Sequence, residues 1–421
     1  MVNNMTGVIY DKDGLAIPVK MWVQPGSNLG KDFNIEDGAL AQIKNLANLP
    51  FAFHHIAIMP DCHQGYGMPI GGVLATEGVI IPNAVGVDIG CGMCAVKTSL
   101  KAENLDKETL KKIMGKIREV IPLGMNHHKE SQNKDLMPKQ LPDDNFGYGK
   151  WSICGKEYES ALKQIGTLGG GNHFIEIQKD IKDNIWIMIH SGSRNLGYKV
   201  AKYYNEVAIK LNEQWHTKVP KKWELAFLPI ETKEAKDYIT EMQYCVDFAL
   251  ANRKLMMDNI YQCFEGSLGK DSFFNKTFIN YGFDIINIAH NYASQENHFG
   301  RNVWVHRKGA TLAREGIIGI IPGSQGTKSY IVKGLGNSDS FMSCSHGAGR
   351  KMGRNQACKD LDLATEIKKL EDQGIIHGIR SVKDLDEASG AYKDIDVVME
   401  NQKDLVEILV ELQPLAVIKG E

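Results

Sequence analysis

Five residues with metal-binding side chains follow apolar runs or glycine-rich turns in this chain. Asp88 and Cys91 stand three residues apart in a glycine-flanked turn, and His173 follows three consecutive glycines. His190 and His290 each follow an apolar run that predicts a strand. Carboxylate, thiolate and imidazole groups together could hold two divalent ions, and a pair of ions suits phosphoryl transfer.

These residues also have simpler interpretations. A buried structural thiol is the commonest fate of a cysteine, and Cys91 could instead form a redox pair with Cys94. No second cysteine pair at matching spacing supports a structural zinc site. A histidine at the start of a strand, as His173 is predicted to be, is more often a structural residue than a ligand.

The strand predicted after the triple glycine could present two kinds of group. Strand alternation places His173 on one face and Phe174 and Glu176 on the other, where an aromatic ring and a carboxylate suit a nucleobase. Arg194, shortly after His190, could pair with a phosphate through two hydrogen bonds.

A second group of motifs suits phosphate chemistry. His346 lies in SCSHGAGRKMGR (343–354), where small neighbours expose it and cations lie nearby, as a histidine that attacks phosphorus requires. HRKGAT (306–311) and IIPGSQGTKSY (320–330) combine glycine, hydroxyl and basic residues, although neither fits the P-loop pattern. The simpler alternative is a surface phosphate site with a bystander histidine.

The elements that must position these residues are those of an α/β protein. Apolar residues at helical spacing predict helices over 105–121 and 232–264. Short branched runs predict buried strands at 185–189, 285–289 and 317–321. The proline-containing stretches 126–151 and 214–231 are predicted to be surface excursions. No long polar linker divides the chain, so one large domain over 1–421 is expected.

Composition narrows the class of protein. The chain has 421 residues with 49 Lys plus Arg against 51 Asp plus Glu, a net charge of −2. This balance excludes a globally basic nucleic-acid coat protein or a polybasic membrane-surface protein. Eight scattered cysteines do not make a disulfide scaffold. With no signal peptide and no long apolar run, a cytoplasmic protein without membrane association is expected.

Seven motifs, in order along the chain, resemble the RtcB family of RNA ligases: VDIGCGM, GGGNHF, HSGSR, AHN, HRKGAT, PGS-x-GT and HGAGR. The resemblance implies a mixed α/β, single-domain fold with central sheets flanked by helices around a dinuclear metal centre. It implies a GTP-dependent ligase with two Mn²⁺ per chain. Its substrates would be RNA ends with a 3′-phosphate or 2′,3′-cyclic phosphate and ends with a 5′-hydroxyl. An archease-like activator is a further partner that the family allows.

The resemblance also assigns roles by matching motif. His346 would carry GMP, Asp61 would orient its ring, and Arg194 and Arg350 would assist catalysis. The metal ligands would be Asp88, Cys91, His173, His190 and His290. GTP would contact Asn172, Phe174, Glu176, Asn291, Pro322, Ser324, Ser329, His346, Ala348, Tyr392 and Lys419. RNA phosphate would meet Arg194, Lys308, Arg350 and Arg354, which with Lys351 would form a local positive funnel.

Three other functions remain open from the sequence. A dinuclear-metal phosphoesterase would use the same ligands for hydrolysis but has no use for HGAGR or for Lys419. A diverged family member could act on an RNA-repair substrate other than tRNA. A non-catalytic RNA-binding protein would need no glycine-exposed histidine.

Overall fold

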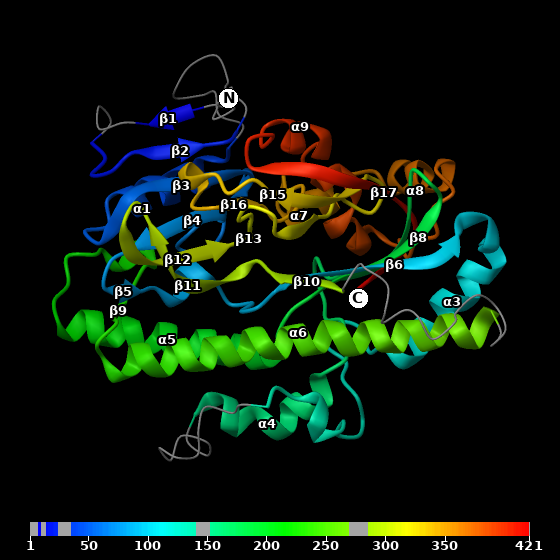
Figure 1. Ribbon diagram of the computed structural model, residues 1–421, viewed down its shortest axis with the longest axis horizontal. Helices are drawn as coiled ribbons and strands as arrows, with labels where there is room; N and C mark the ends of the chain where they lie inside the picture. The colour runs from blue at the N-terminus through cyan, green and yellow to red at the C-terminus, as the bar shows by residue number, and fades with distance from the viewer. Residues whose placement is uncertain (1–6, 10–13, 24–34, 140–151, 269–284, 421) are drawn as a thin grey trace.

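The structure is a computed structural model that describes residues 7–9, 14–23, 35–139, 152–268 and 285–420. Its described strands form two large sheets and two small ones (Figure 1). Neighbouring strands are antiparallel in all the described pairs except β2 with β3. Together with the helices, they confirm the expected mixed α/β architecture.

The six-stranded sheet has the order β1-β2-β3-β4-β12-β11 and the seven-stranded sheet the order β10-β6-β8-β7-β17-β15-β14. Strands of the first are β1 Gly7–Ile9, β2 Val19–Met21, β3 Ala52–His63, β4 Ile70–Thr76, β12 Arg301–Lys308 and β11 Asn291–His298. Strands of the second are β10 Ile286–Ala289, β6 Gly92–Lys101, β8 Asn184–Ser191, β7 Phe174–Asp180, β17 Val406–Lys419, β15 Ser329–Gly334 and β14 Ile318–Ile321. The small sheets pair β13 Ala310–Leu312 with β16 Ser343–Ser345, and β5 Val79–Ile80 with β9 Leu228–Pro229.

Strand β8 shows how the sequence positions the site. All but its first residue are buried, as its continuous apolar run predicts for a central strand. Ile185, Ile187 and Ile189 pack in one apolar cluster with helices α3 and α6, whereas Trp186 and Met188 pack in another. Because side chains alternate, His190 is directed to the same face as Trp186 and Met188.

The helices cover these sheets. Helix α6, Lys233–Leu268, runs almost the length of the molecule in Figure 1, with α5, Arg194–Gln214, alongside it. Helix α3, Lys107–Val120, begins at Asp106, whose carboxylate accepts a hydrogen bond from the Thr109 N–H. The remaining helices are α1 Asp37–Ala47, α2 Pro82–Val85, α4 Ile153–Gln164, α7 Arg354–Asp360, α8 Leu363–Asp372 and α9 Ile395–Glu400. Among the described helices, none is long and apolar enough to cross a membrane.

Most of the predicted elements are present. Helices predicted over 105–121 and 232–264 are α3 and α6, and the three predicted strands are β8, β10 and β14. The prediction that all three strands are buried is wrong for β10, whose residues are only half-buried because it is an edge strand of its sheet. The prediction that 214–231 is a surface excursion is wrong in part, because Leu225 and Leu228 are fully buried. Val219, Trp223 and Phe227 pack against the same apolar cluster as Leu225, so several apolar side chains tie this stretch into the core. Residues 140–151 of the other predicted excursion lie outside the described residues.

Candidate functional site

The two large sheets meet at His290. This residue lies between β10, which belongs to the seven-stranded sheet, and β11, which belongs to the six-stranded sheet. Its backbone N–H donates to the Cys91 carbonyl at 2.8 Å. The Asn291 side chain then donates to the Asp88 carbonyl at 3.1 Å and accepts from the Gly309 N–H at 2.7 Å. Hydrogen bonds from the His290 backbone and the Asn291 side chain thus hold the turn that contains Asp88 and Cys91 against the junction of β10 and β11.

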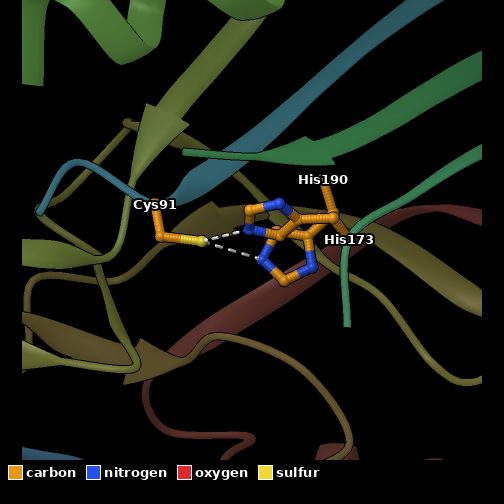
Figure 2. A group of neighbouring side chains, drawn as sticks. All are labelled: Cys91, His173 and His190. Atoms are coloured by element: carbon orange, nitrogen blue, oxygen red, sulfur yellow. Dashed lines mark hydrogen bonds between the residues drawn. The ribbon is translucent and has the colours of Figure 1, made fainter. Parts of the chain in front are cut away.

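Cys91, His173 and His190 converge in space although 82 and 99 residues separate the cysteine from the two histidines. The Cys91 Sγ lies 3.4 Å from His173 Nε2 and 3.3 Å from His190 Nε2 (Figure 2). The cluster continues on both sides: His173 Nε2 is 3.2 Å from Asp88 Oδ2, and His190 Nε2 is 3.4 Å from His290 Nε2. The structure therefore brings together all five predicted metal ligands.

The Nδ1 nitrogens of His173 and His190 face backbone carbonyls, and this contact fixes the protonation of the Nε2 nitrogens that face the cluster. His173 Nδ1 lies 2.9 Å from the Leu168 carbonyl, and His190 Nδ1 lies 3.2 Å from the Asn172 carbonyl. A carbonyl accepts only, so each Nδ1 carries the proton and a neutral ring presents a bare Nε2 lone pair to the cluster. Burial, the largest cause, lowers the pKa of His190 well below its ordinary value, which keeps that ring neutral.

The Nε2 lone pairs of His173 and His190 converge on the Cys91 sulfur, an arrangement that a cation would stabilise on displacing the thiol proton. Cys91, His173 and His190 are buried and have ligand atoms close enough to share one ion. His290 Nδ1 is buried and, among the described residues, has no hydrogen-bond partner. This set of donors fits divalent cations, and sulfur with imidazole suits the softer ones.

The redox alternative for Cys91 is not supported. Cys91 and Cys94 are both free thiols, and Cys94 lies in the apolar cluster beneath α3 and α6. Burial raises the pKa of Cys94 to about 12, so its thiol stays protonated and unreactive.

His346 stands beside this cluster, with its ring edge to face against His290 at a centroid distance of 4.8 Å. Its Nδ1 lies 2.5 Å from Oδ2 of Asp61, and the same oxygen accepts from the His346 backbone N–H at 3.1 Å. Asp61 is fully buried in β3. A buried carboxylate at Nδ1 keeps the proton there and leaves Nε2 as a nucleophile or base.

A cavity of about 950 Å³ is lined by Cys91, His190, His290 and His346 and also by Phe174, Glu176 and Lys419. Lys419 pairs with Phe174 in the β17–β7 register, and its ammonium lies 5.6 Å from the centre of the Phe174 ring. Glu176, two pairs further along, is buried, and burial raises the pKa of its carboxyl to about 8. Gln178 donates to Glu176 at 2.5 Å and to Ser329 at 3.1 Å. An aromatic face, a carboxyl and an ammonium therefore lie together.

The predicted positive funnel needs correction, because two of its arginines are already paired. Arg354 Nε donates to Glu387 Oε1 at 2.8 Å, and Arg350 Nη1 lies 3.1 Å from Glu387 Oε2. The Tyr392 hydroxyl donates to the Glu387 carboxylate. The Arg350 guanidinium lies over the Tyr392 ring, 5.2 Å from the ring centre. Burial is outweighed by Lys419 and the two arginines, so the pKa of Glu387 is lowered. One buried carboxylate thus offsets much of the positive charge expected here.

Two other predicted phosphate contacts use their cationic groups on the protein itself. Lys308 is buried and donates to the carbonyls of Tyr66 and Asn83 at 2.5 and 3.0 Å. Burial lowers the pKa of Lys308 to about 7. Arg194 donates to the Thr167 hydroxyl at 3.2 Å and to the Gly124 carbonyl at 3.3 Å. Arg194 therefore supports the segments that lie beneath the cavity.

Two of the three consecutive glycines are explained by their backbone conformation and close packing. A Cβ on Gly169 would come within 2.1 Å of the Arg194 guanidinium, and one on Gly171 within 2.9 Å of Arg354. Both glycines have positive φ, at 95° and 68°. Only glycine therefore lets this turn lie against both arginines and deliver His173 to the cluster.

Most of the predicted site residues line this one cavity. They are Asp88, Cys91, Asn172, Phe174, Glu176, His190, His290, Asn291, Lys308, Pro322, Ser324, His346, Ala348, Arg350, Arg354, Tyr392 and Lys419. Four others are not among the lining residues: Asp61 and His173 lie behind it in contact with lining side chains, Ser329 contacts Gln178, and Arg194 lies beneath.

Sequence reasoning missed three supporting residues. Asn252 accepts from the backbone N–H groups of Gly166 and Thr167, and Arg253 donates to the carbonyls of Gly90 and Ser191 at 2.9 and 2.8 Å. Both are fully buried in α6. The available signal was an Asn-Arg pair that interrupts the apolar stripe of a long helix. Glu387, the third, has no such signal.

Comparisons with known proteins agree with the geometry. Residues 42–420 match the family model described as tRNA-splicing ligase RtcB. The chain is 40% identical over 415 residues to the RNA-splicing ligase RtcB of Escherichia coli (strain K12), covering 96% of this chain and 97% of that protein. It is 32% identical to the tRNA-splicing ligase RtcB of Nanoarchaeum equitans, covering 91% and 92%. It is 30% identical to the RNA-splicing ligase RtcB of Mycobacterium bovis, covering 90% and 100%.

Proposed function

The chain belongs to the RtcB family of RNA-splicing ligases, and we propose that it joins RNA 3′-phosphate or 2′,3′-cyclic phosphate ends to 5′-hydroxyl ends with GTP as co-substrate. The observation that carries this proposal is the position of His346. Its ring is held by buried Asp61, and it lines the same cavity as Cys91, His190 and His290 and as Phe174, Glu176 and Lys419. A nucleophile, a charge-stabilising site and a base-recognition site together suit nucleotidyl transfer.

In the proposed first step, His346 Nε2 attacks the α-phosphorus of GTP. An N–P bond forms, the bond from phosphorus to the leaving pyrophosphate breaks, and GMP is left on the histidine. Asp61 keeps the other ring nitrogen protonated and balances the positive charge that develops on the ring. The GMP then passes to an oxygen of the RNA 3′-phosphate, and the 5′-hydroxyl of the second RNA end displaces GMP.

The remaining groups have roles that follow from their chemistry. Asp88, Cys91, His173, His190 and His290 would hold two Mn²⁺ ions, which when bound neutralise phosphate charge. Phe174 would stack on guanine, and Glu176 would accept from its N–H edge. Arg350 and Arg354, held by Glu387, would bind the RNA 3′-phosphate.

Covalent labelling tests this proposal. The purified chain is incubated with α-labelled GTP and Mn²⁺, and an acid-labile, alkali-stable label is measured. Wild-type protein is expected to take up label and His346→Ala to take up none. His377→Ala, which removes a buried histidine outside the cavity, is the matched control and should label normally.

The outcomes separate the candidate functions. Absence of label from the wild type, or equal label on His346→Ala, would contradict the ligase mechanism. Metal-dependent phosphate-ester hydrolysis without any covalent label would instead indicate the phosphoesterase.

A further inference from the structure

Tyr66 is the most exposed large apolar side chain around the cavity. It lies in the turn between β3 and β4, its ring is 70% exposed, and it belongs to the cavity lining. None of the steps proposed above uses it. An aromatic ring left in solvent at the edge of a binding cavity is a candidate contact for a ligand.

The backbone around Tyr66 is held in place from two sides. Gln42, from helix α1, accepts from the Gly65 N–H at 3.1 Å and donates to its carbonyl at 2.5 Å. The Glu224 carboxylate accepts from the Gly67 N–H at 3.1 Å. Gly67 has φ of 65°, and a Cβ there would come within 2.5 Å of the Glu224 carbonyl, so the close contact requires glycine.

The Tyr66 carbonyl is held from a third side. It accepts from the Lys308 ammonium at 2.5 Å and from the Met68 N–H at 2.7 Å. Lys308 also bonds the Asn83 carbonyl, which links the turn to helix α2. Three separate elements thus fix the backbone of this turn while the Tyr66 side chain stays exposed. Such a turn loses less entropy when a ligand stacks on the ring than a mobile loop would.

We propose that Tyr66 is a stacking platform for the terminal base of the RNA strand that carries the 5′-hydroxyl. The inference rests on the proposed ligase function and extends it to a specific contact. Every nucleobase has a π-face, so an aromatic platform binds RNA ends without regard to sequence. A ligase that joins varied ends needs such a contact.

The positions of the two sheets indicate which RNA strand stacks on Tyr66. Phe174 and Lys419, proposed to hold guanine, come from β7 and β17 of the seven-stranded sheet, whereas Tyr66 comes from the six-stranded sheet. Attacking and leaving groups are roughly in line across phosphorus. With GMP leaving towards the seven-stranded sheet, we assign the 5′-hydroxyl strand to the side of the six-stranded sheet, to which Tyr66 belongs.

Binding of labelled RNA tests the inference. Single-stranded oligonucleotides with 2-aminopurine at a 5′-hydroxyl end, or at a 3′-phosphate end, are titrated with the full chain in the absence of GTP. For the 5′-hydroxyl probe, Tyr66→Ala is expected to bind roughly 5- to 100-fold more weakly and to lose most of the fluorescence quenching. Tyr66→Trp keeps an aromatic face and should retain both. Tyr198→Ala, on helix α5 and 45% exposed, is the matched control and should match wild type.

Two results would overturn the inference. One is that Tyr66→Ala binds the 5′-hydroxyl probe as wild type does while melting at the same temperature. The other is that only the 3′-phosphate probe is affected. The hydrogen bonds that hold the turn join its backbone to the side chains of Gln42, Glu224 and Lys308 and do not use the Tyr66 side chain, so a folding defect is not expected of either Tyr66 variant. Labelling of the wild-type chain by GTP is measured separately, so failure of the ligase proposal is distinguishable from failure of this one.

Discussion

The carboxylate of Asp61 offers the sharpest test of how His346 is activated. Asp61→Asn keeps the size of the side chain and removes its negative charge. In the wild type, Oδ2 accepts two hydrogen bonds from His346, one from Nδ1 at 2.5 Å and one from the backbone N–H at 3.1 Å. The position is fully buried, so solvent cannot replace the lost charge.

The size of the effect follows from the hydrogen bond at Nδ1, because only that bond strengthens as the ring becomes positive in the transition state. A bond to a charged acceptor contributes about 1 to 1.5 kcal/mol more than a bond to a neutral one. Guanylylation should therefore slow by about 5- to 13-fold at 1.36 kcal/mol per factor of ten. If the Asn amide turns its NH₂ group towards Nδ1, the proton moves to Nε2 and the loss is larger.

The assay is the single-turnover rate of label transfer from α-labelled GTP at saturating Mn²⁺. Asp180→Asn is the matched control, because Asp180 is a buried carboxylate that accepts from Asn184 and Trp186 outside the cavity. The control should lower the melting temperature without changing the rate per folded molecule. A rate for Asp61→Asn within threefold of wild type would refute the assignment of Asp61 as the group that orients His346.

Three further predictions address the metal, the base and the scaffold. Cys91→Ser should lower the Mn²⁺ stoichiometry measured by equilibrium dialysis, because the thiol joins two imidazoles; unchanged stoichiometry would exclude it as a ligand. Burial raises the pKa of Glu176 to about 8, so GTP affinity by calorimetry should rise between pH 6.5 and 8 as the carboxylate ionises. Glu176→Gln should abolish this trend and weaken the preference for GTP over ATP, and a pH trend retained in the variant would assign it to another group. Arg253→Met leaves three buried acceptors unpaired and should cost roughly 3 to 5 kcal/mol in urea unfolding, whereas a loss below about 1 kcal/mol would show that its hydrogen bonds are dispensable.

Local patterns in the sequence predicted much of the scaffold. The apolar period of α3 and α6 and the continuous apolar run of β8 follow from backbone geometry, which acts over a few residues. The same alternation predicted that Phe174 and Glu176 share a face, and both line the cavity. The stretch 214–231 was misjudged because its two buried leucines, Leu225 and Leu228, are too few to show a period.

The ion pairs around the site could not be predicted from local patterns in the sequence. Charge counting treated Arg350, Arg354 and Lys308 as free cations, but Glu387 pairs with the two arginines and backbone carbonyls hold the lysine. Nothing in the spacing of these residues indicates a partner. Desolvation makes each buried charge seek one, and which partner it finds depends on the packing of distant segments.

The sequence by itself determined the chemistry available to this protein. It supplies a thiol, a carboxylate and histidines near predicted strands, and a further histidine flanked by small residues. It also carries the motifs of its family. Only the tertiary structure decided which of these groups meet. Asp61 and His346 are 285 residues apart, and Cys91 reaches His173 and His190 only through the order of the strands in one sheet. Side-chain type is a property of single residues, whereas such contacts depend on sheet order and burial, which arise from the whole chain.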